Sequence, residues 1–285
     1  MASNGMQRID RTLIVIGGHE DKTDKKLILR AVAERVGSGK LVIATVASGI
    51  QKEQYEEYER IFRGLGVRHV YKLEVETRED ALSDRNVRVL DDCTAIFFTG
   101  GDQVKITSQL GCSPVCERIQ EIYEKGGCIA GTSAGASVMS ETMMVSGEGD
   151  ETHKIGGALR LAPGLGLIRG IIVDQHFAER GRIGRLLGAV SQNPRIIGIG
   201  IDENTAVIVE RDRKFTVLGE GGVTILDAGA STYSNITDEE TDRSLSVFDV
   251  KLHMLSQGDI YDCDTRRPSP RPAEIIEEEL LGAPA

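Results

Sequence analysis

The sequence predicts an α/β protein whose mostly parallel sheet carries helices on both faces. Over the first two-thirds of the chain, short apolar runs alternate with longer, charged segments of helical periodicity. Strands that are apolar at every position are typical of a parallel sheet covered on both sides. Because right-handed crossovers bring the carboxyl ends of parallel strands to one edge, we expect the functional loops at that edge.

The individual elements follow from this periodicity. The expected strands are the apolar runs 13–16, 41–46, 69–75, 95–98, 128–130, 171–173 and 196–201. The expected helices are a stretch capped by Asp24 that carries apolar residues from Leu27 to Val36, followed by 51–64, 113–125 and 136–139. Glycine pairs at Gly17-Gly18 and Gly100-Gly101 end two of the strands. Short alternating segments at 204–210, 214–218, 222–227 and 245–251 predict antiparallel additions packed on the same sheet.

We expect one folded domain. With 285 residues, 40% of them hydrophobic, the chain can bury a large core, and no linker divides it. Residues 1–10 are assigned to an N-terminal extension, 11–265 to a single α/β domain and 266–285 to a C-terminal tail. The tail holds clustered prolines followed by a run of glutamates, which predicts a loosely held extension.

The charge balance argues against two classes of partner. Lys and Arg total 34 against 44 Asp and Glu, for a net charge of −10 at pH 7. Nucleic-acid binding relies on neutralising phosphates, so we expect no nucleic-acid partner. We also expect no membrane partner, because no apolar run reaches the ~18 residues of a membrane helix.

Residues 1–10 lack the apolar core of a secretion signal, and the five scattered cysteines complete no set of zinc ligands. These features predict a cytoplasmic protein with reduced thiols and no metal.

The most informative segment is Gly131-Thr132-Ser133-Ala134-Gly135. It fits G-x-S-x-G directly after an expected strand and directly before a helical stretch, which is the context of a nucleophile elbow. Glycines allow the strained backbone and close approach that such a turn requires. Free N–H groups at the start of the following helix favour an oxyanion. Ser133 is therefore the candidate nucleophile; the alternative is a Gly-rich turn with only a packing role.

A serine nucleophile needs a base, and the chain has five histidines. His176 follows the expected strand 171–173, which places it on the same rim as Ser133. His19 follows the first strand and is expected to line this rim. The others are expected in structural or solvated positions: His69, His153 and His253. We therefore predict His176 as the general base.

A carboxylate should fix the tautomer of that imidazole. The strand 196–201 ends in Asp202-Glu203, and from the sequence alone either residue could serve. Asp174 lies two positions before His176 and shares its face only if the strand stays regular. The order serine, histidine, acid differs from the serine, acid, histidine order of α/β-hydrolases. The elbow therefore matches that fold, whereas the order does not.

Four segments together resemble the cyanophycinase family. They are Phe97-Phe98-Thr99-Gly100-Gly101-Asp102-Gln103, Gly131-Thr132-Ser133-Ala134-Gly135-Ala136, Asp174-Gln175-His176-Phe177 and Gly200-Ile201-Asp202-Glu203-Asn204-Thr205-Ala206. The resemblance runs from about Ile14 to Asp262, with the motifs in matching order. That family stands with the aspartyl dipeptidases on a fold similar to class I glutamine amidotransferases, and the same fold is implied here.

The resemblance implies a role for each of five residues. Ser133 is the nucleophile, His176 the base and Glu203 the acid that orients it. The backbone N–H groups of Gly101 and Ala134 form the oxyanion hole.

The implied substrate is cyanophycin, a polyaspartate with arginine amide-linked to each β-carboxylate, which an exopeptidase would release as β-Asp-Arg dipeptides. The resemblance also implies a homodimer that acts without a metal or an organic cofactor.

Each repeat of that substrate carries a guanidinium and a carboxylate. Arginine binds carboxylates at two points, and the resemblance makes substrate ligands of the arginines after His176 and of its flanking residues. The expected substrate-binding set is Gln103, Asp174, Gln175, Arg180, Arg182 and Arg185, with Arg180 foremost. An exposed basic helix face is the alternative interpretation of the arginines.

Two other functions fit parts of the pattern. An aspartyl dipeptidase would also be a serine peptidase, but it would cut after an N-terminal aspartate in small peptides. A non-catalytic amidotransferase-like binding protein would share the fold. True amidotransferases carry cysteine at the elbow, where this chain has Ser133. The Gln103 segment and the arginine run favour the polymer-degrading interpretation.

Overall fold

A computed structural model of the chain describes residues 11–146, 159–210, 213–238 and 243–272. The predicted N-terminal extension, most of the predicted tail and His153 lie outside these residues. The strands are β1 (Thr12–Ile16), β2 (Lys40–Ala44), β3 (His69–Leu73), β4 (Cys93–Phe98), β5 (Cys128–Thr132), β6 (Thr142–Ser146), β7 (Arg160–Pro163), β8 (Ile171–Gln175), β9 (Ile197–Ile201), β10 (Thr205–Val209), β11 (Lys214–Gly219), β12 (Val223–Asp227), β13 (Tyr233–Ser234), β14 (Val247–Phe248), β15 (Lys251–Leu255), β16 (Ile260–Asp262) and β17 (Arg267–Ser269). The helices are α1 (Leu27–Val36), α2 (Gln51–Gly64), the 3₁₀ turn η1 (Asp80–Leu82), α3 (Asp84–Val89), α4 (Gln103–Leu110), α5 (Pro114–Glu124), α6 (Ala134–Ser137) and α7 (Ile183–Gln192).

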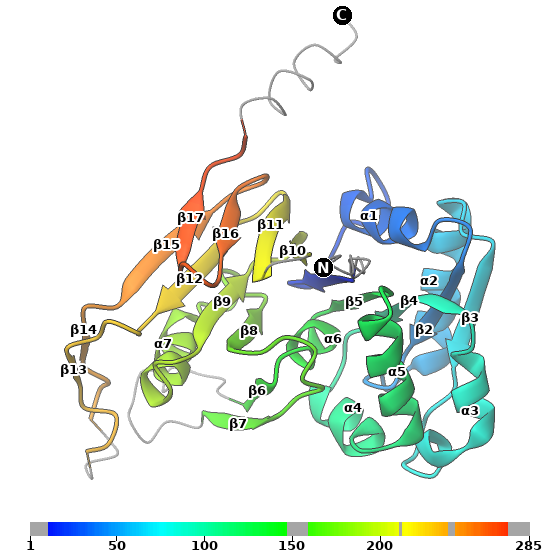
Figure 1. Cartoon of the computed structure of the whole chain (residues 1–285), viewed down its shortest axis with the longest axis horizontal. Helices are drawn as coiled ribbons and strands as arrows, with labels where there is room; N and C mark the ends of the chain where they lie inside the picture. The colour runs from blue at the N-terminus through cyan, green and yellow to red at the C-terminus, as the bar shows by residue number, and fades with distance from the viewer. Residues whose placement is uncertain (1–10, 147–158, 211–212, 239–242, 273–285) are drawn as a thin grey trace, which may run out of the picture.

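A nine-stranded mixed sheet forms the centre of the molecule, in the order β17-β16-β11-β10-β1-β5-β4-β2-β3 (Figure 1). All neighbours from β1 to β3 are parallel. All neighbours from β1 outward to β17 are antiparallel. The predicted α/β class, with a parallel sheet and antiparallel additions in the last third, is confirmed.

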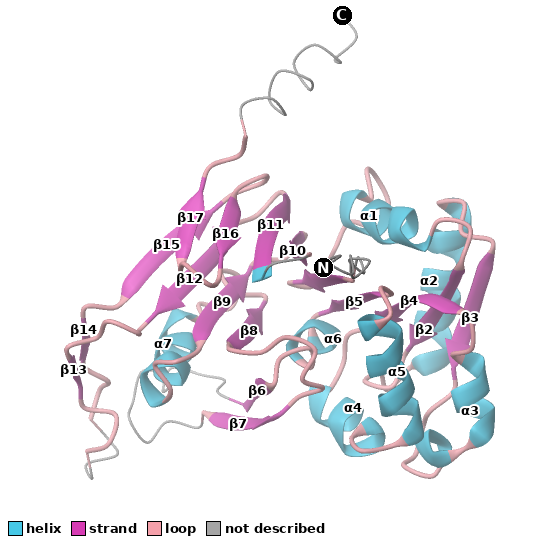
Figure 2. Ribbon diagram, viewed as in Figure 1, coloured by secondary structure: helices cyan, strands magenta, loops and turns pink. Residues whose placement is uncertain are grey.

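The two faces of the parallel half bury alternate residues of each strand. In β1, Ile14 and Ile16 belong to a core that includes residues of α1 and α2. Leu13 and Val15 belong to a larger core that includes residues of α4, α5 and α6. Helices therefore cover both faces, as strands that are apolar throughout require. Figure 2 shows α1 and α5 on either side of these strands.

A second, four-stranded sheet corrects one expectation. The segments 222–227 and 245–251 were expected on the main sheet, but β12 pairs instead with β9 and β15, in the order β15-β12-β9-β8. The strand within 245–251 is β14, which pairs with β13 in a two-stranded sheet of its own. One face of this sheet joins the larger core through Val173 and Ile199. The other face packs on α7 through Ile172 and Leu226. This second sheet is therefore a layer between the larger core and α7.

The first residues of the predicted tail are part of the main sheet. Arg267–Ser269 forms β17, which pairs antiparallel with β16. Pro268 is tolerated there because β17 is an edge strand, where one side of the backbone needs no partner. Arg266 also forms an ion pair with Asp227 of β12. The expectation of a loosely held extension from Arg266 onward is therefore wrong for residues 266–269.

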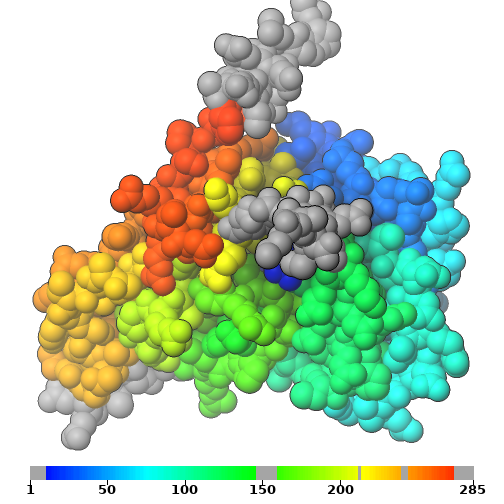
Figure 3. Space-filling view, in the orientation of Figure 1, coloured from blue at the N-terminus to red at the C-terminus, as the bar shows by residue number. Residues whose placement is uncertain are grey.

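The space-filling view shows how the segments share the surface. In Figure 3, residues of the N-terminal part (blue and cyan) and of the last third (yellow to red) occupy opposite sides, with the middle of the chain (green) between them. Within the described residues, none of the helices combines the length and apolar character needed to traverse a bilayer.

Candidate active site

Ser133 occupies the strained turn that the sequence predicts. It follows β5 directly, has φ 53° and ψ −110°, and precedes α6. The glycines on either side are needed because the turn is tightly packed. A Cβ on Gly131 would lie 2.4 Å from the carbonyl oxygen of Gly135, and one on Gly135 would lie 2.5 Å from that of Phe98. The segment therefore has the geometry of a nucleophile elbow.

Ser133, His176 and Glu203 form a continuous hydrogen-bonded series. Ser133 Oγ lies 2.9 Å from His176 Nε2, and His176 Nδ1 lies 2.6 Å from Glu203 Oε1. Because an ionised carboxylate can only accept, Nδ1 carries the proton and Nε2 accepts from the serine hydroxyl. The imidazole is thus oriented to take a proton from Ser133.

The end of β1 holds the three segments of this series together. Three successive carbonyl oxygens each accept a hydrogen bond from the backbone N–H of one segment. Ile16 O accepts from Ser133 at 3.0 Å, and Gly17 O accepts from His176 at 2.8 Å. Gly18 O accepts from Asn204, the residue after Glu203, at 2.9 Å. The His176 segment belongs to the second sheet, yet these bonds bring it against the main one. This short turn therefore fixes the relative positions of serine, imidazole and carboxylate.

The two acids after β9 have different surroundings. Glu203 contacts His176, whereas the carboxylate of Asp202 accepts backbone N–H groups from Ala178 at 3.0 Å and Gly222 at 2.9 Å. Asp202 therefore bridges three loops and does not contact the imidazole. The geometry distinguishes the two residues, which the sequence alone could not.

Burial and hydrogen bonds set the protonation of the series. Burial lowers the pKa of His176 below its usual 6.5 and the charge of Arg180 lowers it further, against the opposing effect of the Glu203 hydrogen bond. Partial burial alone would raise the pKa of Glu203, but hydrogen bonds from His176 and His19 outweigh it and leave that pKa below its usual 4.5. At neutral pH the imidazole is neutral and the carboxylate ionised, as a base with an orienting acid requires.

His19 makes a contact that the sequence did not predict. Its Nδ1 lies 2.8 Å from Glu203 Oε1, the same oxygen that accepts the hydrogen bond from His176 Nδ1. The two imidazoles meet edge to face with centroids 5.0 Å apart. The His19 side chain is 72% exposed, whereas that of His176 is 5% exposed. The expected position on the rim is correct, and its partner, Glu203, is visible only in three dimensions.

The residues predicted for the oxyanion hole belong to two turns near the serine. Gly100, next to Gly101, is close enough that a Cβ on it would lie 3.9 Å from Ser133 Oγ. Gly101 has φ 140°, and a side chain there would meet the carbonyl oxygen of Ala47 at 2.2 Å. Ala134 is the first residue of α6, so its N–H has no partner within that helix. Both groups predicted for the oxyanion hole thus come from turns adjoining Ser133.

Three residues expected to bind substrate lie instead beneath the site. Asp174, Arg182 and Arg185 are 0%, 7% and 4% exposed. Arg185 Nε donates to Asp174 Oδ2 at 2.7 Å, and Arg182 bonds Asp174 Oδ1 at 3.2 Å. Their buried ion-pair cluster braces the chain after β8, so direct contact with substrate is not supported. Gln175, 6% exposed, is likewise a buried residue of β8.

The other two expected ligands differ in accessibility. The amide of Gln103 donates to the carbonyl of Met144 at 2.8 Å, which ties α4 to β6 and leaves the amide oxygen and a second N–H. Arg180 is exposed, four residues beyond His176, and its charge acts on that imidazole. Of the three predicted arginines, Arg180 alone offers an exposed guanidinium at this edge.

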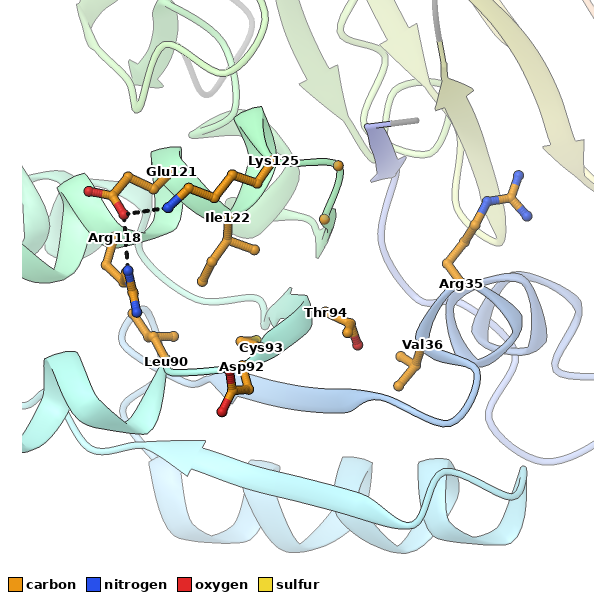
Figure 4. Close-up of a pocket in the computed structure, with 12 residues that line it drawn as sticks. Arg35, Val36, Leu90, Asp92, Cys93, Thr94, Arg118, Glu121, Ile122 and Lys125 are labelled. Atoms are coloured by element: carbon orange, nitrogen blue, oxygen red, sulfur yellow. Dashed lines mark hydrogen bonds and ion pairs between the residues drawn. The ribbon is translucent and has the colours of Figure 1, made fainter. Parts of the chain in front are cut away.

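A hollow of 510 Å³ lies at the opposite, amino ends of β4 and β5 (Figure 4). Its cations have partners: Arg118 and Lys125 both bond Glu121, at 3.0 and 3.2 Å, and Arg35 bonds Glu210 at 2.5 Å. Its lining residues contain no serine or histidine. Ser133, His176 and Glu203 instead meet at the other edge, where β5 ends.

Fold and site together define a hydrolase, because serine, imidazole and carboxylate in series are the arrangement of hydrolytic enzymes. The model of peptidase family S51 matches residues 13–217.

The chain is 37% identical over 258 residues to a cyanophycinase from Synechococcus elongatus, covering 90% of this chain and 80% of that protein. It is 36% identical over 274 residues to a cyanophycinase from Geminocystis herdmanii, covering 95% and 99%. The crystal structure of a peptidase from an acI-B1 Actinobacterium has the same fold, with a TM-score of 0.66, 23% identity and coverage of 88% and 96%. The protein belongs to peptidase family S51 and is a peptidase.

Proposed function

We propose that this peptidase degrades cyanophycin and that Ser133, His176 and Glu203 carry the reaction. The observation that carries the proposal is the series of 2.9 and 2.6 Å contacts that joins the three side chains. The named relatives supply the substrate class. Cyanophycin has a polyaspartate backbone with arginine on each β-carboxylate, so the expected product is the β-Asp-Arg dipeptide.

The reaction proceeds through an ester on Ser133. His176 Nε2 accepts the hydroxyl proton as Oγ bonds to the backbone carbonyl carbon of an aspartyl residue. The carbonyl oxygen becomes negative and accepts hydrogen bonds from the N–H groups of Gly101 and Ala134, one such donor being worth about 3–4 kcal/mol. The C–N bond then breaks, and the imidazolium gives its proton to the leaving amine.

Water completes the cycle. The neutral imidazole of His176 removes a proton from water, whose oxygen attacks the ester carbon. The ester C–O bond breaks, and Ser133 Oγ recovers the proton. Glu203 accepts from Nδ1 throughout and stabilises the imidazolium formed in both halves.

Arg180 is the proposed ligand for a substrate carboxylate. Its guanidinium is exposed and close enough to His176 to influence the pKa of that imidazole. A guanidinium binds a carboxylate through two parallel hydrogen bonds. Gln103 is proposed to orient a peptide edge through its remaining amide groups. These contacts would favour cutting near a chain end.

The proposal extends to the working form of the enzyme. Residues 11–265, extended by β17 to residue 269, would form one catalytic domain, and the protein would act as a homodimer in the cytoplasm without a metal or an organic cofactor. Light scattering on the purified protein tests the dimer, and activity in the presence of a chelator tests the independence from metal.

The decisive experiment incubates the protein with insoluble cyanophycin and identifies the soluble products by mass spectrometry. Release of β-Asp-Arg by the wild-type protein, and its loss in Ser133→Ala, is expected. Hydrolysis of small Asp-X peptides without release from the polymer would instead identify an aspartyl dipeptidase. No hydrolysis of either substrate would leave a non-catalytic protein and reject the proposal.

A further inference from the structure

Three metal-binding side chains meet at the exposed end of the site. One ring nitrogen of His19, one ring nitrogen of His176 and a carboxylate oxygen of Glu203 all lie within 4.8 Å of one another. Glu203 Oε1 is 2.8 Å from His19 Nδ1 and 2.6 Å from His176 Nδ1. Two imidazole nitrogens and one carboxylate oxygen are a ligand set that zinc uses in proteins, with a fourth position left for water.

The distances suit a small tetrahedral ion. Zinc bonds nitrogen and oxygen at about 2.0–2.2 Å, so its ligands stand about 3.4 Å apart. The two contacts of Glu203 Oε1 with the imidazoles, 2.8 and 2.6 Å, are shorter than this value. The limit of 4.8 Å on all distances among the three ligand atoms is longer. Rotation of His19 supplies the adjustment, because its side chain is 72% exposed and little packs against it. The same exposure leaves room for a water ligand.

His19 is the residue that completes the set. Without it, only His176 and Glu203 would contact the ion, and two protein ligands hold zinc weakly. The next residue, Glu20, points elsewhere: it is 3% exposed, and its carboxylate accepts hydrogen bonds from Tyr58 at 2.5 Å and from Thr132 at 2.6 Å. Zinc binding should therefore depend on the imidazole of residue 19.

We propose that His19, His176 and Glu203 bind one Zn²⁺ ion that switches the enzyme off. The metal replaces the hydrogen bonds that Glu203 receives from the two imidazoles. Binding at Nδ1 of His176 requires that nitrogen's lone pair, so the proton moves to Nε2 and the imidazole stays neutral. Nε2 then donates to Ser133 Oγ and can no longer accept its proton. The inhibitory consequence rests on the proposed function, whereas the binding does not.

Binding is measured by calorimetric titration with zinc chloride. All variants carry Cys112→Ser, because Cys112 is an exposed thiol that could bind zinc by itself. One ion per chain is expected, with an affinity at least about tenfold weaker in His19→Ala, since one of three ligands is lost. The control is His69→Ala, an exposed histidine on the distant edge strand β3, which should bind as the parent does. Absorption of bound Co²⁺ in the visible range reports the same ligand set.

Inhibition is measured on the same proteins, each relative to its own rate in chelator. Zinc should inhibit the parent and His69→Ala reversibly, and the half-inhibitory concentration should rise at least about tenfold in His19→Ala.

Failure of the Cys112→Ser parent to bind zinc, or equal affinity in parent and His19→Ala, would overturn the site. Binding that depends on His19 without loss of activity would overturn the inhibitory role alone. Lack of activity on cyanophycin would reject the proposed function and leave the binding result standing.

Discussion

Gly18 packs against the imidazole of His176, and a single methyl group there should disable the site. A Cβ on Gly18 would lie 2.3 Å from His176 Cε1 and 2.6 Å from Nε2. The backbone at Gly18 has φ 109°, which also disfavours a side chain. Gly18→Ala therefore combines a direct clash with backbone strain.

The size of the clash sets the expected loss. Non-bonded carbon atoms rest about 3.5–4.0 Å apart, so the ring must move by about 1 Å. His176 is 4% exposed and hydrogen-bonded at both nitrogens, so that movement separates Nε2 from Ser133 Oγ. A misplacement of about 1 Å costs about 100-fold in rate, which corresponds to about 2.7 kcal/mol in the barrier.

The assay is kcat/KM on cyanophycin, with melting temperature measured alongside. Gly66→Ala is the matched control, because Gly66 also has positive φ, 94°, but a Cβ there would meet nothing within 4 Å. Both variants carry a backbone penalty of about 1–2 kcal/mol, and only Gly18→Ala should lose activity. A Gly18→Ala protein with kcat/KM within about threefold of the control would refute the reasoning.

Three further predictions follow from the surroundings of the site. Glu203→Gln should lower kcat about 100-fold or more, because an amide no longer holds the imidazole tautomer, whereas Asp202→Asn should chiefly lower stability in denaturant titration. Arg180→Ala removes a charge that lowers the pKa of His176; that pKa should rise, so the acidic limb of the kcat/KM profile should move to higher pH. Asp174→Ala leaves the buried guanidinium of Arg185 without the carboxylate that it pairs with and should cost about 3–5 kcal/mol in urea unfolding.

The sequence predicted the parts of the site that depend on local geometry. The elbow at Ser133 and the position of His176 after a strand each depend on only a few consecutive residues, and both predictions agree with the structure. The choice of Glu203 over Asp202 came from the family resemblance. Both acids follow the same strand, and only the loops around Ala178 and Gly222 determine which one turns away.

Arg182 and Arg185 are buried, whereas the sequence predicted that they bind substrate. A run of arginines after the base was interpreted as a substrate surface, but Arg182 and Arg185 point to the interior. A signal was present: Arg185 lies beside Leu186 and four residues before Ala189, on the apolar face of α7. The buried partner, Asp174, comes from another element, so the sequence alone could not supply the pairing.

The most direct test of the central claim is mass-spectrometric mapping after treatment with a serine-directed fluorophosphonate. The account predicts one phosphonyl adduct per chain, on Ser133, with fluoride released and with labelling strongly slowed in His176→Ala. Labelling of a different residue, or an unchanged rate in His176→Ala, would contradict the claim that Ser133 is a nucleophile activated by His176.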